Sequence, residues 1–231
     1  MSAVDLLPGM LKFAASVQTP TEFTEYSFVD KSRNNHVSRN KKTSTVRILA
    51  DPPGGDFGGR LRANKAILNH VFDDLQIAEE RRVVMIAIAM QETNTMSPGE
   101  RDWTKDHNTD KSANYSIFNL NEDFITQVTG KPPDPRVLPM VDHRALLDLQ
   151  ATKFAVHVIN KAMDIWKPLV KVLVFHSGGG TAFNAYSPGA VDPLGLCKGY
   201  HHAIATIATT IEANSGLRSD HQRVAVEVPH H

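Results

Sequence analysis

Apolar residues recur at helical spacing through most of the chain and predict a core built mainly from helices. A first helix is expected after the turn at residues 51–55, because a set of apolar side chains falls on one of its faces. The set consists of Leu61, Leu68, Val71, Phe72 and Leu75. A second helix begins near Ala78 and is apolar on all sides from Val83 to Met90. Such a pattern is typical of a helix at the centre of a core.

The second half of the chain predicts four more helices. A short one is expected at about residues 122–128, and a long one begins near His143. The buried stripe of the long helix consists of Phe154, Ala155, Val158, Ile159, Ala162, Ile165 and Trp166. Pro168 suits the first turn of a further helix, which is expected to end at Ser177–Gly180. The last helix is expected to end at Gly216, and its apolar face consists of Ile204, Ile207, Ala208 and Ile211.

Weaker patterns at both ends set the predicted domain organisation. Residues 1–50 suggest an N-terminal extension of short strands and loops packed on the same domain, and residues 51–216 form the main domain. Residues 217–231 show no helical stripe and are expected to form a loosely held tail. The predicted fold class is therefore α+β, mainly α, with a small β or irregular lobe.

Charge and composition exclude several classes of function. Lys and Arg together number 25, as do Asp and Glu, so the net charge is zero. Such a chain lacks the long-range attraction that nucleic-acid binders use, and nucleic acid is not expected as a partner. The one cysteine, Cys197, excludes an internal disulfide and a cysteine-built zinc site. No apolar run approaches the roughly 18 residues of a membrane span, so we expect a soluble globular protein without metal or cofactor.

Glu92 is the first candidate for chemistry, because it lies where the apolar helix opens into a polar loop. A carboxyl shielded from water on one side keeps its proton more readily and can deliver it to a leaving group. The loop that follows offers the second carboxylate that glycoside hydrolysis needs. Its acids are Glu100, Asp102, Asp106 and Asp110, and spacing alone does not choose among them.

Two other interpretations of these acids stay open. Glu92 can be a helix-terminal carboxylate paired with a nearby base, with the loop acids simply solvated. The loop also matches the opening of a calcium-binding EF-hand at Asp106, Asn108 and Asp110. The sixth position of that loop is Lys111 instead of Gly, and the twelfth is Ile117 instead of Glu, which disfavours calcium.

A longer set of residues resembles glycoside hydrolase family 134. The specific matches are Ala89–Met96, Lys105–Asp106 and Ser112–Asn119, supported by Gly58–Asn64 upstream and Val174–Gly179 downstream. The resemblance covers roughly residues 51–215. It implies a lysozyme-like fold and an endo-β-1,4-mannanase that inverts the anomeric centre.

The resemblance also implies roles for individual acids. Glu92 falls on the general acid of the family and Asp106 on its general base, with Asp102 as the fallback base. Inversion needs the two carboxyls roughly 6.5 to 9.5 Å apart, so that a water fits between them. The implied partners are β-1,4-mannan and manno-oligosaccharides, cleaved by a secreted monomer, although residues 1–17 form a poor signal peptide.

Amide, aromatic and imidazole side chains around this block are candidates for binding sugar. They are Asn94, Trp103, Asn114, Tyr115, Asn119 and His176. Each also has a structural interpretation: the amides can bond their own backbone, the aromatics can pack beneath the loop, and His176 can cap its helix. The functional alternatives are a peptidoglycan-cleaving lysozyme or lytic transglycosylase, and a carbohydrate- or calcium-binding module without catalysis.

Overall fold

The computed structural model describes residues 45–50, 56–93, 96, 114–134, 147–185 and 199–227. This part is mainly helical, which confirms the prediction of a mainly α chain with few strands. Its α-helices are α2 (Asp56–Asp74), α3 (Glu79–Glu92), α4 (Glu122–Thr129), α5 (Leu149–Ile165), α6 (Leu169–Ala185) and α8 (Tyr200–Ala213). Its remaining elements are β1 (Thr45–Ala50), β2 (Asn114–Tyr115), β3 (Leu120–Asn121), β4 (Gln222–Glu227) and the 3-10 helix η3 (Ser215–Arg218).

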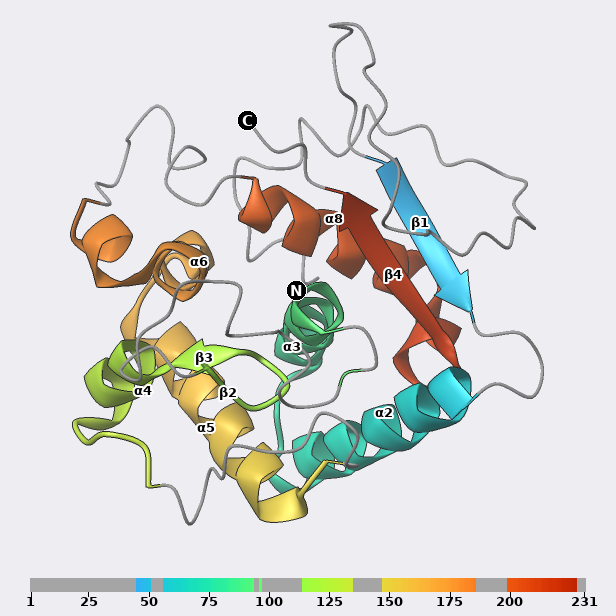
Figure 1. Ribbon diagram of the computed structural model, residues 1–231, viewed down its shortest axis with the longest axis horizontal. Coiled ribbons are helices and arrows are strands. Elements are labelled where there is room, and N and C mark those ends of the chain that lie inside the picture. The colour runs from blue at the N-terminus through green and yellow to red at the C-terminus, as the bar shows by residue number, and fades with distance from the viewer. Residues whose placement is uncertain are drawn as a thin grey trace, which may run out of the picture.

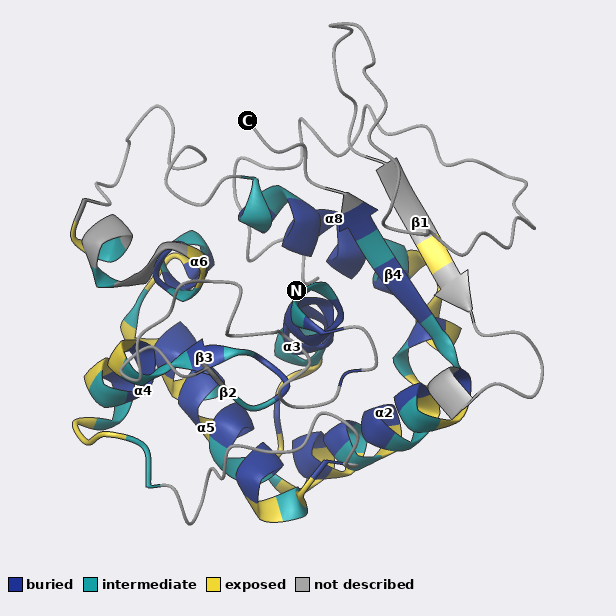
Figure 2. Cartoon of the chain, in the orientation of Figure 1, coloured by how far each residue is buried: buried dark blue, intermediate teal, exposed yellow. Residues whose placement is uncertain are grey.

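Helix α3 lies at the centre of the described fold. It packs against α8, β4 and α5, and Figure 1 shows it nearly end-on among them. Every residue from Val83 to Met90 is buried, as its uniformly apolar sequence predicts. In Figure 2, α2 and α5 each show an exposed stripe, as expected for helices that cover a core with one face. Burial on all sides makes α3 a rigid support for the carboxyl at its end.

The C-terminal region differs from the predicted loose tail. Strand β4 pairs antiparallel with β1 along its whole length, from Thr45 opposite Glu227 to Ala50 opposite Gln222. Its Val224 and Val226 are buried against the core. The apolar period here is two, typical of a strand, so a search for helical stripes misses it.

Helices α5 and α6 differ from their predicted limits. Helix α5 begins at Leu149 instead of near His143, because the Asp148 side chain caps it by accepting a hydrogen bond from the Ala151 amide at 2.8 Å. Helix α6 continues through the predicted stop at Ser177–Gly180 to Ala185. Phe183 in this extension packs against other aromatic rings of the core, with ring centroids 4.9 Å away. This packing offsets the low helix propensity of glycine.

The short helix α4 matches its predicted position closely. The Asn121 side chain caps its first turn by accepting a hydrogen bond from the Phe124 amide at 2.7 Å. Gly130 ends it in the left-handed conformation, with φ of 79°. Among the described helices, none combines the length and the hydropathy that crossing a membrane requires.

Candidate active site

Glu92 is the last residue of α3, and its side chain is only 7% exposed. The helix ends directly after it, where Thr93 turns to an extended conformation and directs both its amide and its hydroxyl to the Ala89 carbonyl. The buried Arg223 of β4 donates from Nε to the Met90 carbonyl at 2.7 Å. These contacts satisfy carbonyls near the end of α3, which helix termini otherwise leave without partners. The carboxyl therefore lies on a well-anchored helix end.

A tight turn between β2 and β3 approaches Glu92 from a second direction. It spans Ser116–Asn119, and the Asn119 amide donates to the Ser116 carbonyl at 3.1 Å. Ser116 and Asn119 both adopt left-handed backbone conformations, with φ of 66° and 54°. Ile117 and Phe118 at the tip are buried in the core. Burial of the tip therefore holds the flanking polar groups in place.

Helix α6 supplies a third group, His176, whose side chain is 3% exposed. The His176 Nε2 atom lies 2.5 Å from the Phe118 carbonyl oxygen, and Nδ1 lies 3.8 Å from Glu92 Oε1. The side-chain amide of Asn119 donates to the other carboxyl oxygen, Glu92 Oε2, at 2.9 Å. The three elements α3, α6 and the β2–β3 turn thus bring an acid, an imidazole and an amide together.

Aromatic rings fix the orientation of the imidazole. The Tyr200 ring, from the start of α8, stacks on it with centroids 5.5 Å apart and planes at 14°. The Phe124 ring, from α4, meets its edge at 6.0 Å. Stacking on one side and an edge contact on another restrict rotation of the His176 ring.

Tyr115 lies on β2, directly before the turn that carries Asn119. Burial raises the pKa of its phenol, and the negative charge of Glu122 adds to this effect. The group therefore stays protonated near neutral pH, and it can donate a hydrogen bond but does not serve as a base.

The structure thus brings together three of the residues that the sequence singled out, Glu92, Asn119 and His176. The strand β2 places the backbone of Asn114 opposite Asn121. The candidates Asn94, Glu100, Asp102, Trp103, Asp106 and Asp110, with the EF-hand-like Asn108, lie outside the described residues, as does the Asn114 side chain. A scan against models of known protein families found no match, and neither did a search of the curated proteins.

Sequence reasoning missed three partners of this site. The Phe118 carbonyl carries no sequence signal, because any residue supplies one. Tyr200 and Phe124 are single aromatic residues in helical segments, and nothing in their local pattern indicates that they contact His176. The Ser-Ile-Phe-Asn turn is part of the family resemblance, but its role in aligning Asn119 with Glu92 depends on the fold.

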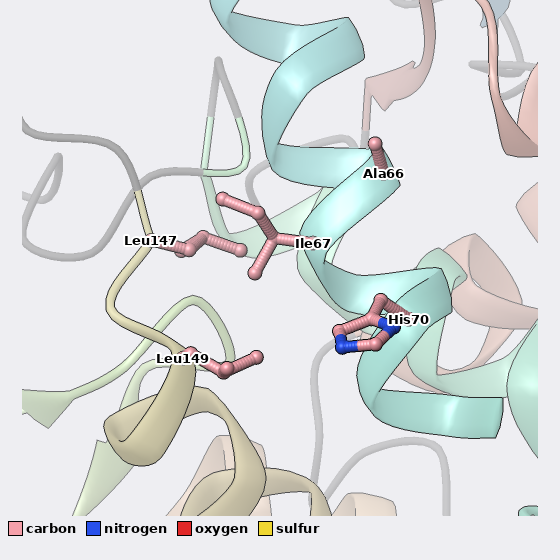
Figure 3. Close-up of a pocket in the computed structure, with 5 residues that line it drawn as sticks. All are labelled: Ala66, Ile67, His70, Leu147 and Leu149. Carbon is pink, nitrogen blue, oxygen red and sulfur yellow. The ribbon is translucent and has the colours of Figure 1, made fainter. Parts of the chain in front are cut away.

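A separate hollow of about 380 Å³ lies between α2 and the segment that enters α5 (Figure 3). It is lined by Ala66, Ile67, His70, Leu147 and Leu149. The lining is almost entirely apolar and includes none of the Glu92, Asn119 and His176 side chains. Within the described ranges, no cluster of three or more His, Cys, Asp or Glu side chains has the arrangement of a metal site.

Proposed function

We propose that the chain is an endo-acting β-1,4-mannanase with a lysozyme-like, mainly α fold and an inverting mechanism. Glu92 is the general acid and Asp106 the general base, following the family resemblance. The substrates are linear mannan and manno-oligosaccharides, cleaved by a secreted monomer that uses no metal or cofactor.

The environment of the Glu92 carboxyl is the observation that supports this proposal most. The side chain is almost fully buried at the end of a rigid apolar helix, and its Oε2 atom accepts a hydrogen bond from Asn119. In the proposed mechanism, Oε1, the oxygen that faces His176, carries the acid proton. A carboxyl with one oxygen held and the other protonated suits proton delivery in a defined direction.

In the proposed reaction, the proton on Glu92 Oε1 moves to the glycosidic oxygen as the bond from that oxygen to the anomeric carbon breaks. A water molecule attacks the carbon from the opposite face, and Asp106 takes the proton that this water loses. One water is consumed, and the new reducing end has inverted configuration. Exchange with solvent then returns the proton to Glu92 and removes the one on Asp106.

Incubation with mannohexaose and, separately, with peptidoglycan tests substrate and stereochemistry together. NMR of the first products should show cleavage of mannohexaose with inverted anomers. Retained configuration would contradict the mechanism even if mannan were cleaved. Cleavage of peptidoglycan alone would support the lysozyme or transglycosylase alternative. A melting temperature that falls on adding a chelator would support a calcium-binding module.

Two substitutions test the assigned roles. Glu92→Gln and Asp106→Asn should each lower kcat by at least about a hundredfold and leave the fold intact. Glu80→Gln, in the first turn of the same helix, is the matched control and should retain full activity. Near-normal activity of Asp106→Asn would contradict the inverting assignment.

A further inference from the structure

The hydrogen bond from His176 to the Phe118 carbonyl determines which imidazole nitrogen carries a proton. A carbonyl oxygen only accepts hydrogen bonds, so Nε2 must donate at its 2.5 Å separation. In the neutral ring, Nδ1 then has a lone pair and no proton. The protonation of Nδ1 is therefore the one variable left on this ring.

The Nδ1 atom is buried, and it has no hydrogen-bond partner among the described residues. It faces Glu92 Oε1 at 3.8 Å, while Asn119 occupies Oε2. Without a proton, a lone pair would face a carboxylate, so two acceptors would oppose each other. With one proton on Oε1 and another on Nδ1, two donors would oppose each other. A single proton on Oε1 or on Nδ1 provides one donor and one acceptor.

We propose that His176 holds one proton jointly with Glu92 and positions it for delivery from Oε1, instead of contacting the sugar. This inference rests on the proposed function, because it concerns the acid of the same site. It replaces the sugar-binding role expected for His176 with one exerted through Glu92, which makes His176 a positioning residue. Its Nε2 atom lies against the Phe118 carbonyl, and its buried Nδ1 atom faces Glu92 Oε1 at 3.8 Å.

Among the described residues, groups from four elements lie against the imidazole. They are the Glu92 carboxyl of α3, the Tyr200 ring of α8, the Phe124 ring of α4 and the Phe118 carbonyl of the turn. Of these, the Glu92 carboxyl is the group that faces Nδ1, at 3.8 Å. The carboxyl is therefore the group to which the His176 proton is coupled.

His176→Gln is the sharpest variant, because an amide nitrogen can still donate to the Phe118 carbonyl but cannot bind a proton. We expect kcat on mannohexaose to fall about tenfold with little change in KM. The value of kcat/KM should fall by about the same factor, because the acid proton is less well positioned while the binding of substrate is unchanged. His176→Phe, which keeps the aromatic packing, should lower kcat at least as much.

Two results would overturn the assignment. A rise in KM with an unchanged kcat would make His176 a sugar-binding residue. A loss of activity in His176→Phe that His176→Gln fully restores would make it purely structural.

Nitrogen NMR of histidine-labelled protein tests the shared proton without any turnover. The His176 signals should show the neutral form protonated on Nε2, and Glu92→Gln should change the Nδ1 chemical shift at constant pH. An unchanged Nδ1 signal in Glu92→Gln would contradict the coupling. Coupling in a protein that does not cleave mannan would support the shared proton and reject only the proposed substrate.

Discussion

Two buried polar clusters tie distant parts of this chain together, and they differ in how completely their hydrogen bonds are formed. In the first, the Lys65 ammonium of α2 donates to the Leu217 and Gln222 carbonyls, each at 2.5 Å, and to Asp220 Oδ1 at 3.1 Å. In the second, Glu92 meets Asn119 and His176. Both clusters join segments far apart in sequence and exclude solvent from a charged or chargeable group.

The two clusters differ in whether every buried polar atom has a hydrogen-bond partner. Lys65 has three donors and three oxygen partners, so its cluster is complete and serves the fold. The His176 Nδ1 atom instead lies 3.8 Å from a carboxyl oxygen and has no hydrogen bond within the described residues. A buried polar atom without a partner is unfavourable for stability and calls for an explanation. The comparison therefore places Lys65 in the scaffold and supports the proposed catalytic role of Glu92.

Removing the Lys65 ammonium should produce the largest change in stability. Lys65→Met removes the donor to two carbonyls and the cation that pairs with Asp220, whose Oδ1 still accepts from the Gln222 amide at 2.9 Å. We therefore expect a loss of about 3 kcal/mol in the free energy of unfolding. Urea denaturation measures this loss. Below the melting temperature the folded variant should keep the kcat of the wild type, because no contact to Glu92 is removed. A tenfold fall in kcat of the folded variant would contradict the separation of the two clusters.

The matched control is Lys153→Met, whose lysine pairs with Asp74 at the surface at 2.7 Å. It should lose less than a third as much stability, because exposed ion pairs contribute little. The pH dependence gives a second check. Burial lowers the pKa of Lys65 below its ordinary 10.5, and the Asp220 hydrogen bond and charge oppose this only in part.

The unfolded chain therefore binds a proton at Lys65 more readily than the folded chain does. Where the pH lies between the folded-state pKa and 10.5, the stability of the wild type relative to Lys65→Met should rise with pH. Below that window the difference should be constant. Urea denaturation at several pH values from neutral upward measures this stability difference. A difference that falls as the pH rises would contradict the expectation.

The sequence predicts these regions unequally, for a physical reason. The apolar run from Val83 to Met90 specifies the central helix locally, so the position of Glu92 at its end was predictable. The contacts of Glu92 were not, because Asn119 lies 27 positions away and is aimed by a turn whose tip is buried in the core. The pairing of β1 with β4 joins residues 45–50 with residues 222–227, and no local pattern indicates a partner.

The continuation of α6 through its glycines has the same origin. Glycine is a poor helix former, so the local pattern predicts an end at Ser177–Gly180. The contacts of Phe183 with Trp166 and Phe175 supply the missing stabilisation, and they exist only in the folded chain. Local propensity thus identified the helices, whereas tertiary packing decided their limits and the composition of the site.

Removing the Asn119 amide should reduce activity moderately and stability very little. Asn119→Gly keeps the left-handed backbone at no steric cost and deletes the hydrogen bond to Glu92 Oε2. We expect kcat to fall about tenfold, equivalent to about 1.4 kcal/mol, because the acid is less well oriented. Steady-state kinetics on mannohexaose measures this, with KM expected to stay within about twofold.

The matched control is Ser116→Gly, at the other left-handed position of the same turn. Its hydroxyl accepts a hydrogen bond from the Phe118 amide at 3.2 Å and makes none to Glu92 among the described contacts. The control should keep its kcat. If Asn119→Gly raised KM and left kcat unchanged, Asn119 would be a sugar-binding residue, as the sequence first suggested.

The smallest expected effect comes from Asn121, whose amide caps a helix, and it tests the role proposed for Asn119. Asn121→Ala removes the cap of α4, whose hydrogen bond to the Phe124 amide is 2.7 Å long, and should cost about 1 kcal/mol of stability. Asp148→Ala removes the equivalent cap of α5 and should cost about the same. Urea denaturation measures both, and kcat should stay within about twofold of the wild type.

If Asn121→Ala lowered kcat as much as Asn119→Gly, the rigidity of the whole hairpin, and not the single bond to Glu92, would control the acid. The Glu92 cluster would then belong with the Lys65 cluster as part of the scaffold, and the comparison between them would fail.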